Sequence, residues 1–416
     1  MKILFAPIGD PSNYETVKYK IDDKEYETNA CFRAISDHLG IDKVTVYAGL
    51  SLCSGCNNLE CCIDSVKQKV SQKIGSNFEL LIAPNIYGTK FIQKDRRNTL
   101  YFNFVYFNSL KILEQSKPDE IYIDITHGIN YMPLLATDAI MLATYAYVVE
   151  NVKDVTLKIY NSEPIMRGNK GPYTIDNIYS EKITVRQALI FLLSFFLSND
   201  SKNVIKNKVL KTNDNEGKSR VTYLCRPDLI YSLVNSLSGG VFPYILMRAQ
   251  ETNECLKKVE NLFEKLDFFN NYSVKLTFEQ GGVVYEDAMP IEISYLHSLV
   301  RGVSRITPVD VERIKISEIR NLANNYSISD AVKYMILNEI DQIENKYGNN
   351  IPNQPTLYAK IKEDKVTKPC SVDKRNLLAH GGFEENVTYL WKDKGEIIMS
   401  YNGEQECLSE VERQLR

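Results

Sequence analysis

The first 165 residues alternate short apolar runs with longer segments of helical periodicity, and this alternation restricts the possible fold more than any other feature of the chain. Helices are expected at residues 28–39, 60–75, 97–116 and 131–150. Between them lie five runs that are rich in β-branched residues and end in glycine, proline or polar turn residues. These runs are KILFAPIG from Lys2, KVTVYAG from Lys43, FELLIAP from Phe78, EIYIDITHG from Glu120 and VTLKIYNSEP from Val155. Such alternation predicts an α/β fold, with a parallel sheet covered by helices on both faces.

From about residue 176 the pattern becomes mostly helical. Helices are expected within residues 184–198, 254–269 and 327–348, and Ser327 or Ser329 could cap the last of them. One β-hairpin is expected in YSVKLTFEQGGVVYED at 272–287, with Gly281 and Gly282 in its turn. Because 416 residues exceed what one hydrophobic core usually covers, we expect several domains. The predicted division is an α/β domain at 1–170, a helical connector with the hairpin at 171–300 and a mostly helical domain at 301–416.

The charge balance and the N-terminus exclude some classes of protein. The chain has 50 Lys and Arg against 53 Asp and Glu, so it has no global positive field, and a nucleic-acid substrate would need a local site. The opening MKILFAPIGDPSNY breaks its apolar run too early for a signal peptide, and no segment has the ~20 uninterrupted apolar residues of a membrane span. We therefore expect a cytoplasmic protein without a membrane partner.

Nine cysteines include a cluster of four in SLCSGCNNLECC, namely Cys53, Cys56, Cys61 and Cys62. Four thiolates suffice for a zinc site, although adjacent cysteines at 61 and 62 depart from the usual pair of knuckles. Disulfides are rare in most cytosols but occur inside hyperthermophiles, and the Lys-, Ile-, Glu- and Tyr-rich composition fits a thermophilic source. Disulfides, zinc and free thiols all remain open, and none of them assigns a reaction.

Two loops at expected strand ends are candidate ligand sites. PIGDPSNY follows the first strand, and THGINYMP follows the fourth and precedes a helix. Backbone N–H groups at a helix start attract phosphates, and glycine lets a ligand approach the main chain. Neither loop has the GxGxxG or GK[ST] motif, which disfavours nicotinamide binding and ATP hydrolysis. The alternative is that these are ordinary turn residues. The candidate ligand-binding residues are Gly9, Asp10, Pro11, Ser12, Asn13, Thr126, His127, Gly128, Ile129 and Asn130.

A second candidate site lies near the end of the chain, in DKRNLLAHGG at 373–382. On a helix, Asn376 and His380 share a face, whereas Arg375 lies about 140° from His380 and has to reach round. Gly381 and the next glycine end the helix, which leaves His380 in an exposed last turn. A histidine can move protons near neutral pH, and a guanidinium stabilises the charge that develops on phosphorus. Together they can cleave a phosphodiester without a metal; the alternative is a surface histidine that caps its helix.

Both stretches resemble known families. The Rossmann-like N-terminal region with an Asp-x-Thr-x-Gly loop, Asp124 to Gly128, resembles the CARF domains of CRISPR-associated proteins over residues 1–165. The string RNLLAHGG resembles the Arg-Asn-x-x-Ala-His core of HEPN ribonucleases, which lies near the end of an all-helical domain. By that resemblance Arg375 and His380 form the catalytic pair, Asn376 supports them, and no metal or cofactor is required.

A CARF domain followed by a HEPN domain resembles the auxiliary ribonucleases of type III CRISPR systems. The resemblance implies degradation of single-stranded RNA, switched on by a cyclic oligoadenylate such as cyclic tetra-adenylate bound across a CARF dimer. A homodimer, or a larger assembly of dimers, also follows from chemistry. RNA cleavage needs one group to take the 2′ proton and another to supply the leaving-group proton, and the motif has one histidine, His380, per chain.

Three other functions remain open at this point. The N-terminal domain could cleave its own cyclic activator. The chain could be a nucleotide-sensing transcription regulator, for which NVIKNKVLKT at 203–212 is the only modest candidate for a basic recognition helix. It could also be a toxin-like ribonuclease that needs no ligand.

Overall fold

A computed structural model describes residues 1–93, 99–128, 131–166, 168–197, 203, 205–212, 222–265, 276–279, 282–285, 290–306, 310–362 and 368–416. The chain divides into two compact units. The first comprises Met1–Val148, Lys153–Thr184 and Asn261–Ser294, and the second comprises Val149–Val152, Val185–Glu260 and Tyr295–Arg416. The boundaries expected at 170 and 300 stay a prediction, but the residues of the expected connector are shared between the two units rather than forming a third.

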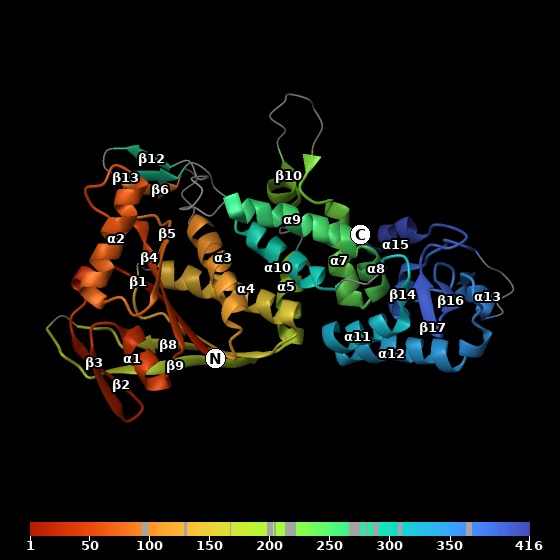
Figure 1. The fold of residues 1–416 in the computed structure, drawn as a ribbon, viewed down its shortest axis with the longest axis horizontal. Helices are drawn as coiled ribbons and strands as arrows, with labels where there is room; N and C mark the ends of the chain where they lie inside the picture. Colours follow the sequence, from red (N-terminus) through yellow and green to blue (C-terminus); the bar gives the residue numbers. More distant parts are fainter. Residues whose placement is uncertain are drawn as a thin grey trace. The chain divides into compact units, whose positions relative to one another are not determined.

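An eight-stranded sheet forms the centre of the first unit, in the order β3-β2-β9-β8-β7-β1-β4-β5 (Figure 1). Its strands are β1 (Lys2–Ile8), β2 (Val17–Ile21), β3 (Lys24–Thr28), β4 (Lys43–Gly49), β5 (Glu79–Ala83), β7 (Glu120–Asp124), β8 (Val155–Ser162) and β9 (Tyr173–Ile183). The five strands predicted from the sequence are all present, and they pair in parallel. The sequence patterns missed the β2–β3 hairpin and β9, which extend the sheet beyond β8.

Four helices connect the parallel strands and confirm the helices predicted in this part. They are α1 (Cys31–Leu39), α2 (Leu59–Ile74), α3 (Thr99–Ser116) and α4 (Tyr131–Asn151). Right-handed crossovers place α1 and α2 on one face of the sheet and α3 and α4 on the other, and Figure 1 shows α2 opposite α3 and α4. Of the described helices, α4 alone is long and apolar enough to cross a membrane, yet two thirds of its apolar window is buried, as in a core helix.

The strand order has one reversal point, between β1 and β7. Successive crossovers lead from β1 to β4 and β5 in one direction, whereas β7 and β8 lie on the other side of β1. In such sheets, ligands bind in the crevice beyond the carboxyl ends of the strands at the reversal. Here those ends are Ile8 and Asp124, which directly precede the two loops that the sequence singled out.

The predicted hairpin is present as β12 (Leu276–Glu279) and β13 (Gly282–Tyr285), while Gly281 lies outside the described residues. Strand β13 pairs in parallel with β6 (Phe91–Gln93), so the hairpin belongs to the first unit and not to a connector. Sequence patterns could not show this pairing, because its partners are about 190 residues apart along the chain.

The chain from α5 onward is mostly helical, and the predicted helices at α5, α9 and α12 are confirmed. Its helices are α5 (Val185–Leu197), α7 (Pro227–Gly239), α8 (Phe242–Met247), α9 (Ala249–Lys265), α10 (Glu292–Ser304), α11 (Ile316–Tyr326), α12 (Asp330–Asn345), α13 (Tyr358–Ile361), α14 (Lys374–Ala379) and α15 (Leu408–Leu415). Ser329 caps α12 by accepting a hydrogen bond from the Val332 N–H. The candidate recognition helix is instead a π-helical segment, Ile205–Leu210, followed by the two-residue strand β10 (Lys211–Thr212).

The predicted mostly helical C-terminal region is confirmed, and a four-stranded sheet that the sequence analysis did not predict interrupts its helices around the C-terminal motif. Its order is β14-β17-β16-β15, with strands β14 (Ile314–Lys315), β15 (Thr356–Leu357), β16 (Tyr389–Asp393) and β17 (Glu396–Ser400). The β16–β17 turn uses Lys394 and Gly395, both at positive φ. Two of the four strands have only two residues, which is too short for an alternation pattern to be recognised.

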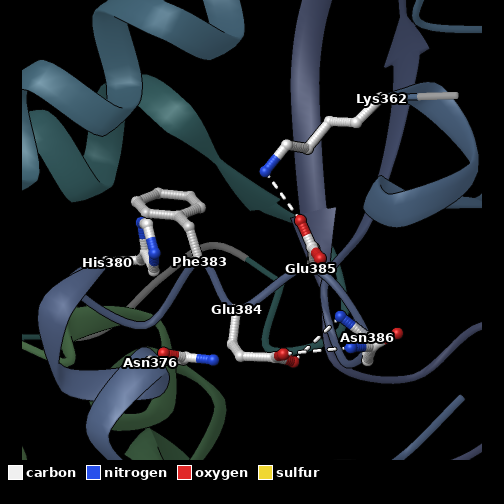
Figure 2. Close-up of a pocket in the computed structure, with 7 residues that line it drawn as sticks. All are labelled: Lys362, Asn376, His380, Phe383, Glu384, Glu385 and Asn386. Carbon is white, nitrogen blue, oxygen red and sulfur yellow. Dashed lines mark hydrogen bonds and ion pairs between the residues drawn. The ribbon is translucent and has the colours of Figure 1, made fainter. Parts of the chain in front are cut away.

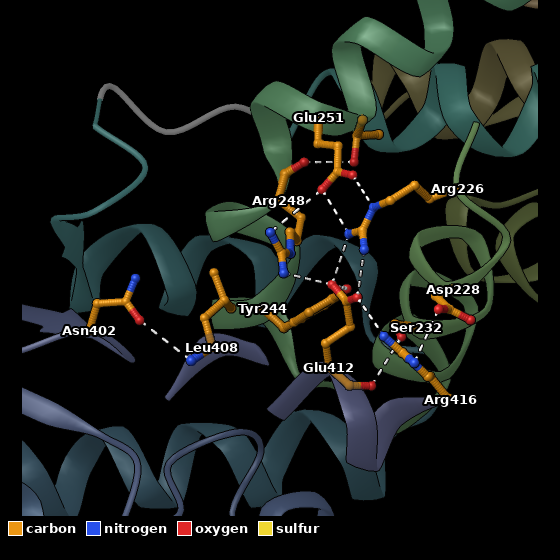
Figure 3. Close-up of polar contacts among 11 residues, drawn as sticks. Arg226, Asp228, Ser232, Tyr244, Arg248, Glu251, Asn402, Leu408, Glu412 and Arg416 are labelled. Atoms are coloured by element: carbon orange, nitrogen blue, oxygen red, sulfur yellow. Dashed lines mark hydrogen bonds and ion pairs between the residues drawn. The ribbon is translucent and has the colours of Figure 1, made fainter. Parts of the chain in front are cut away.

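A buried carboxylate anchors the C-terminal helix. Glu412 of α15 is only 2% exposed and binds Arg226 at 3.0 Å, Arg248 at 2.7 Å and the hydroxyl of Tyr244 at 2.9 Å (Figure 3). Burial alone would raise its pKa, but the two guanidinium groups and the phenol hold the pKa of Glu412 at about 2. The charge is therefore retained, and α15 is held against α7 and α8.

The cysteines separate into bonded and free groups. Within the four-cysteine cluster Cys56 and Cys61 form a disulfide, while the thiols of Cys53 and Cys62 lie 2.7 Å apart and are free. Across the described residues no group of three or more His, Cys, Asp or Glu side chains could hold a metal ion. Two further disulfides lie in the second unit, Cys225–Cys255 and Cys370–Cys407. The second of these joins the segment before α14 to the start of α15.

Candidate functional site

The two loops predicted from the sequence meet at the reversal point of the first unit. A Cβ atom on Gly9 would lie 3.5 Å from the backbone of Gly128, so the two glycines pass within van der Waals distance of one another. Gly128 has a φ of +137°, and a Cβ there would lie only 2.9 Å from the ring of Pro133. Both the backbone conformation and the close approach therefore require glycine at 128. Ile129 and Asn130 lie outside the described residues.

An aromatic pair forms the floor between the loops. The rings of Tyr14 and His127 stack with centroids 4.4 Å apart, and the Tyr14 hydroxyl accepts a hydrogen bond from the Gly9 N–H at 2.9 Å. His127 Nε2 accepts from the Cys31 N–H at 3.3 Å, which places the ring proton on Nδ1. Burial lowers the pKa of His127, with the nearby charge of Asp124 acting in the opposite direction. His127 is therefore neutral at physiological pH, and it offers a ring face rather than a positive charge.

Thr126 has a structural place inside the loop. Its hydroxyl donates to the Cys31 sulfur at 3.1 Å and accepts from the Ser162 N–H at 2.9 Å, while its own N–H donates to Asp124 at 2.9 Å. Asp124 is 1% exposed, and burial raises the pKa of its carboxyl group. These bonds tie the end of β7 to β8 and to the start of α1, so the sequence prediction found the loop but not the inward direction of this side chain.

Asp10 shapes the first loop and contributes little free charge. It accepts a hydrogen bond from the Ser12 N–H at 2.9 Å and pairs with Lys69 of α2 at 2.9 Å. Partial burial raises the pKa of Asp10, but the Ser12 hydrogen bond and the Lys69 ammonium outweigh it and lower the pKa overall. Pro11 is buried at the start of the short 3-10 turn that follows, and Asn13 at its end is exposed.

Two adjoining cavities, which share His127 and Ile165, open beside these loops. The larger one measures about 520 Å³, and the smaller one about 300 Å³. Sequence analysis missed the contributions of Tyr14, Asn29 and the segment after β8. The contribution of the segment after β8 could have been expected from the strand order, because the carboxyl end of β8 lies beside that of β7. The larger cavity is lined by Ser12, Asn13, Tyr14, Glu15, Asn29, His127, Ile165 and Met166, and the smaller one by Thr126, His127, Asn161, Ser162, Glu163, Pro164 and Ile165.

The C-terminal motif forms a six-residue helix with a defined start and end. Asp373 caps α14 by accepting a hydrogen bond from the Asn376 N–H at 2.9 Å, and His380 follows the last helical residue. The His380 N–H still donates to the Asn376 carbonyl at 3.0 Å. The predicted exposed helix end is confirmed, since 44% of the His380 side chain is accessible to solvent.

Two glycines press the end of α14 against the rest of the second unit. Gly381 has a φ of +56°, and a Cβ there would lie 2.6 Å from Cγ1 of Ile336 on α12. Gly382 has a φ of +92°, and its carbonyl accepts a hydrogen bond from the buried Tyr401 hydroxyl at 2.8 Å. The chain therefore turns tightly after His380 and brings that residue against α12.

A cavity of about 150 Å³ lies beside His380 (Figure 2). Lys362 pairs with Glu385 at 2.7 Å across it, and Glu384 accepts hydrogen bonds from the backbone and side-chain nitrogens of Asn386 at 2.9 and 3.2 Å. Burial raises the pKa of Glu384, against the lowering effects of Asn386 and His380. The cavity is lined by Lys362, Asn376, His380, Phe383, Glu384, Glu385 and Asn386.

The three motif residues differ in their surroundings. Asn376 and His380 line the cavity together, as expected for two residues on one face of a helix. Arg375 is exposed, does not line the cavity and, within the described part of the chain, has no hydrogen-bond or ion-pair partner. An exposed guanidinium without a described partner is suited to a phosphate that arrives from outside.

Sequence analysis missed a carboxylate that touches the motif. Glu339 Oε1 lies 2.7 Å from His380 Nδ1, although the two residues are 41 positions apart. Glu339 belongs to the buried stripe of α12 together with Ile336, Ile340 and Ile343. A charged residue in an apolar stripe is unusual unless it has a partner, and that irregularity was a signal in the sequence.

Comparison with known proteins adds two family matches. Residues 3–164 match the model for the CARF domain of the CRISPR system endoribonuclease Csx1, and residues 329–403 match the model for the HEPN domain of the same family. A curated relative, the CRISPR system endoribonuclease Csx1 of Methanocaldococcus jannaschii, is 25% identical over 94% of this chain and 86% of its own length. Among solved structures, Enterococcus italicus Csm6 bound to cyclic hexa-2′-fluoro-hexa-dAMP is 13% identical, covering 100% of this chain and 93% of that one, with a TM-score of 0.28.

The tight turn after His380 gives the first prediction. Gly381→Ala is expected to slow RNA cleavage at least about tenfold, because the new Cβ would overlap Ile336 and move His380 away from α12. Gly395→Ala is the matched control, since Gly395 has a φ of +85° but no atom within 4 Å of the added Cβ. It should bear only the backbone cost of about 1–2 kcal/mol and keep its cleavage rate. Equal losses of activity in the two variants at equal stability would contradict the role of this turn.

Proposed function

The chain belongs to the CRISPR-associated CARF–HEPN ribonucleases, and from that premise we propose that a cyclic oligoadenylate bound by the first unit switches on cleavage of single-stranded RNA at Arg375 and His380. The observation that carries the proposal is that the matched HEPN region holds both a half-exposed His380 and an exposed Arg375 without a described partner. We place this reaction in type III CRISPR antiviral defence, in the cytoplasm.

The cleavage chemistry follows from these side chains. The 2′ oxygen of the RNA attacks the neighbouring phosphorus as its proton passes to the imidazole of one His380, and the 5′ oxygen leaves as it receives a proton from an imidazolium. The products are a 2′,3′-cyclic phosphate and a 5′ hydroxyl. Arg375 stabilises the negative charge on the phosphoryl oxygens. This sequence needs no metal, because the two proton transfers and the guanidinium supply all the stabilisation it uses.

The chemistry of the cavities at the reversal point of the sheet suits this activator. An oligoadenylate has phosphates and aromatic bases, and the larger cavity is lined by the polar side chains of Ser12, Asn13 and Asn29 and by the stacked rings of Tyr14 and His127. The match of residues 3–164 to a CARF domain supports this ligand class. We propose cyclic tetra-adenylate or a related ring as the allosteric activator.

A homodimer would complete both sites. The motif supplies one His380 per chain, whereas the reaction uses one base and one acid, and a two-fold contact brings the same residue from each copy to the axis. A symmetric cyclic ligand would likewise fit a two-fold sensor. It can activate the enzyme only by binding the active arrangement more tightly than the inactive one.

Removal of the proposed catalytic groups tests the reaction. His380→Ala is expected to lower cleavage of a single-stranded RNA by ~10²–10⁴-fold while the fold is kept, because the side chain is half exposed. Arg375→Lys should also be impaired, since an ammonium cannot reproduce the planar fork of the guanidinium. Cleavage by the wild type should persist in EDTA. Near wild-type activity of His380→Ala would exclude this site, and loss of activity in EDTA would indicate a metal mechanism.

A change of charge tests the activator site. Asn13→Asp should weaken binding of cyclic tetra-adenylate at least about fivefold, because a carboxylate within ~4 Å of a phosphate costs roughly 1 kcal/mol or more even in water. Gln68→Glu, in a separate groove on α2, introduces the same charge outside the site and should leave the affinity unchanged. Isothermal titration calorimetry measures both variants. Unchanged affinity in Asn13→Asp would remove this loop from the ligand site.

Mixed dimers test the composite site. When His380→Ala subunits are added in excess to a fixed amount of wild type and allowed to exchange, the cleavage rate per wild-type subunit should fall steeply, because the mixed dimers lack one of the two histidines. Inactive subunits that carry an additional affinity tag allow the mixed dimers to be isolated and assayed. If each wild-type subunit keeps its full rate in the mixed dimers, a single His380 suffices and the composite site is excluded.

A further inference from the structure

Glu339 is a buried carboxylate whose position in the fold needs an explanation. It is 8% exposed on α12, in a stripe where Ile336, Ile340 and Ile343 are fully buried. Burying a carboxylate without a partner is costly, and an apolar residue would pack in this stripe without that cost. The described contact that compensates the charge is the hydrogen bond to His380.

The contact distinguishes the two nitrogens of the imidazole. Glu339 Oε1 lies 2.7 Å from Nδ1, and because a carboxylate only accepts, Nδ1 carries the proton and donates. Nε2 is then the nitrogen that is free to take up or release a proton, since no contact to it is found among the described residues. The side chain of His380 is 44% exposed, so Nε2 can reach a substrate from solvent.

Other polar groups surround the pair. Burial opposes the raised pKa of Lys362, at the end of α13, whereas Glu385 and, to a smaller extent, Tyr347 and Glu339 raise it. Burial, together with the charge of Glu339, raises the pKa of Tyr358. Glu384, a carboxylate whose pKa is raised by burial, lines the same cavity as His380. Of these acidic groups, Glu339 makes the direct contact with the ring.

We propose that Glu339 is a positioning residue for RNA cleavage, which fixes His380 in the tautomer with a free Nε2 and stabilises the imidazolium that forms when Nε2 takes the 2′ proton. The proposal rests on the function proposed above. Glu339 does not touch the substrate. It acts through His380, in the way that a buried aspartate orients the histidine of a serine protease.

A purely structural role is the competing explanation. The pair joins the end of α14 to α12, so the loss of Glu339 could displace the motif without any effect on the tautomer. The two explanations differ in the protonation of the ring, which nitrogen-15 spectra of the four histidines report directly. The His380 signals are assigned by their absence in His380→Ala.

Glu339→Gln separates the two explanations. The amide keeps the size of the side chain, but its NH₂ group can donate to Nδ1 and so favour the wrong tautomer, with the proton on Nε2. We expect kcat to fall about 10²–10³-fold with KM changed less than about threefold, and the ring signals to move to the Nε2–H tautomer. Glu339→Asp keeps a carboxylate and should restore part of kcat together with the original tautomer.

Glu344→Gln is the matched control. Glu344 is on the same helix and pairs with Arg320 on the surface, so its substitution removes a carboxylate from α12 without touching His380. Its kcat and ring signals should equal those of the wild type. Melting temperature and cyclic tetra-adenylate affinity are measured for every variant, so that a loss of fold is detected.

Failure of the positioning role of Glu339 can be distinguished from failure of the proposed ribonuclease function. Full activity of Glu339→Gln alongside an inactive His380→Ala would overturn the positioning role and leave the proposed function intact. Activity of His380→Ala would overturn the function. If Glu339→Gln does not fold, the wild-type spectrum still decides, because a ring protonated on Nε2 and not on Nδ1 would contradict the proposal.

Discussion

The close packing of the Gly381 turn on helix α12 is the contact on which the geometry of the C-terminal site depends. Gly381 leaves no room for a side chain between its backbone and Ile336, and Ile336 lies one turn before Glu339 on the same helix. The backbone of α14 is therefore held at a distance at which His380 reaches Glu339. A residue with a Cβ would separate the two elements, and the imidazole would lose its partner. The pair of glycines thus serves the chemistry as well as the end of the helix.

The first unit uses a similar constraint for a different purpose. Gly9 and Gly128 let the two loops at the reversal point approach within van der Waals distance, and the bonds of Thr126 fix one of them to the neighbouring elements. Among the described residues that line the cavities, His127 is neutral and Glu15 and Glu163 are acidic, while the nearby Asp10 is paired with Lys69. Phosphates of the proposed activator would be bound by polar side chains that the loops hold in place. Such binding would depend on the shape of the loops.

Much of the first unit could be predicted from the sequence because its parallel strands are buried on both faces and read as continuous apolar runs. The strands β2, β3 and β9 have exposed positions and lie beyond the alternating pattern, so they were missed. For the C-terminal site, the local string identified Arg375, Asn376 and His380, since these residues lie on one short helix. Glu339 could not be assigned from that string, because its contact depends on how α12 packs. The only indication in the sequence was that Glu339 lies in an apolar stripe. This position indicates that the carboxylate has a partner, but it does not identify His380 as that partner.

The charged side chains of the C-terminal site include the carboxylates that line the cavity and the guanidinium of Arg375. Glu384 and Glu385 line the same cavity as His380, and Glu385 forms an ion pair with Lys362. A phosphodiester would be repelled there, although the raised pKa of Glu384 reduces that repulsion. Arg375 is exposed and lies outside the cavity lining, so its guanidinium would offer a phosphate a favourable approach there. In the proposed reaction, Glu339 would stabilise the protonated imidazole, while the Arg375 guanidinium would hold the reacting phosphate. A reaction of this kind needs the two roles on separate groups, because the carboxylates that stabilise a positive imidazolium repel a negative substrate.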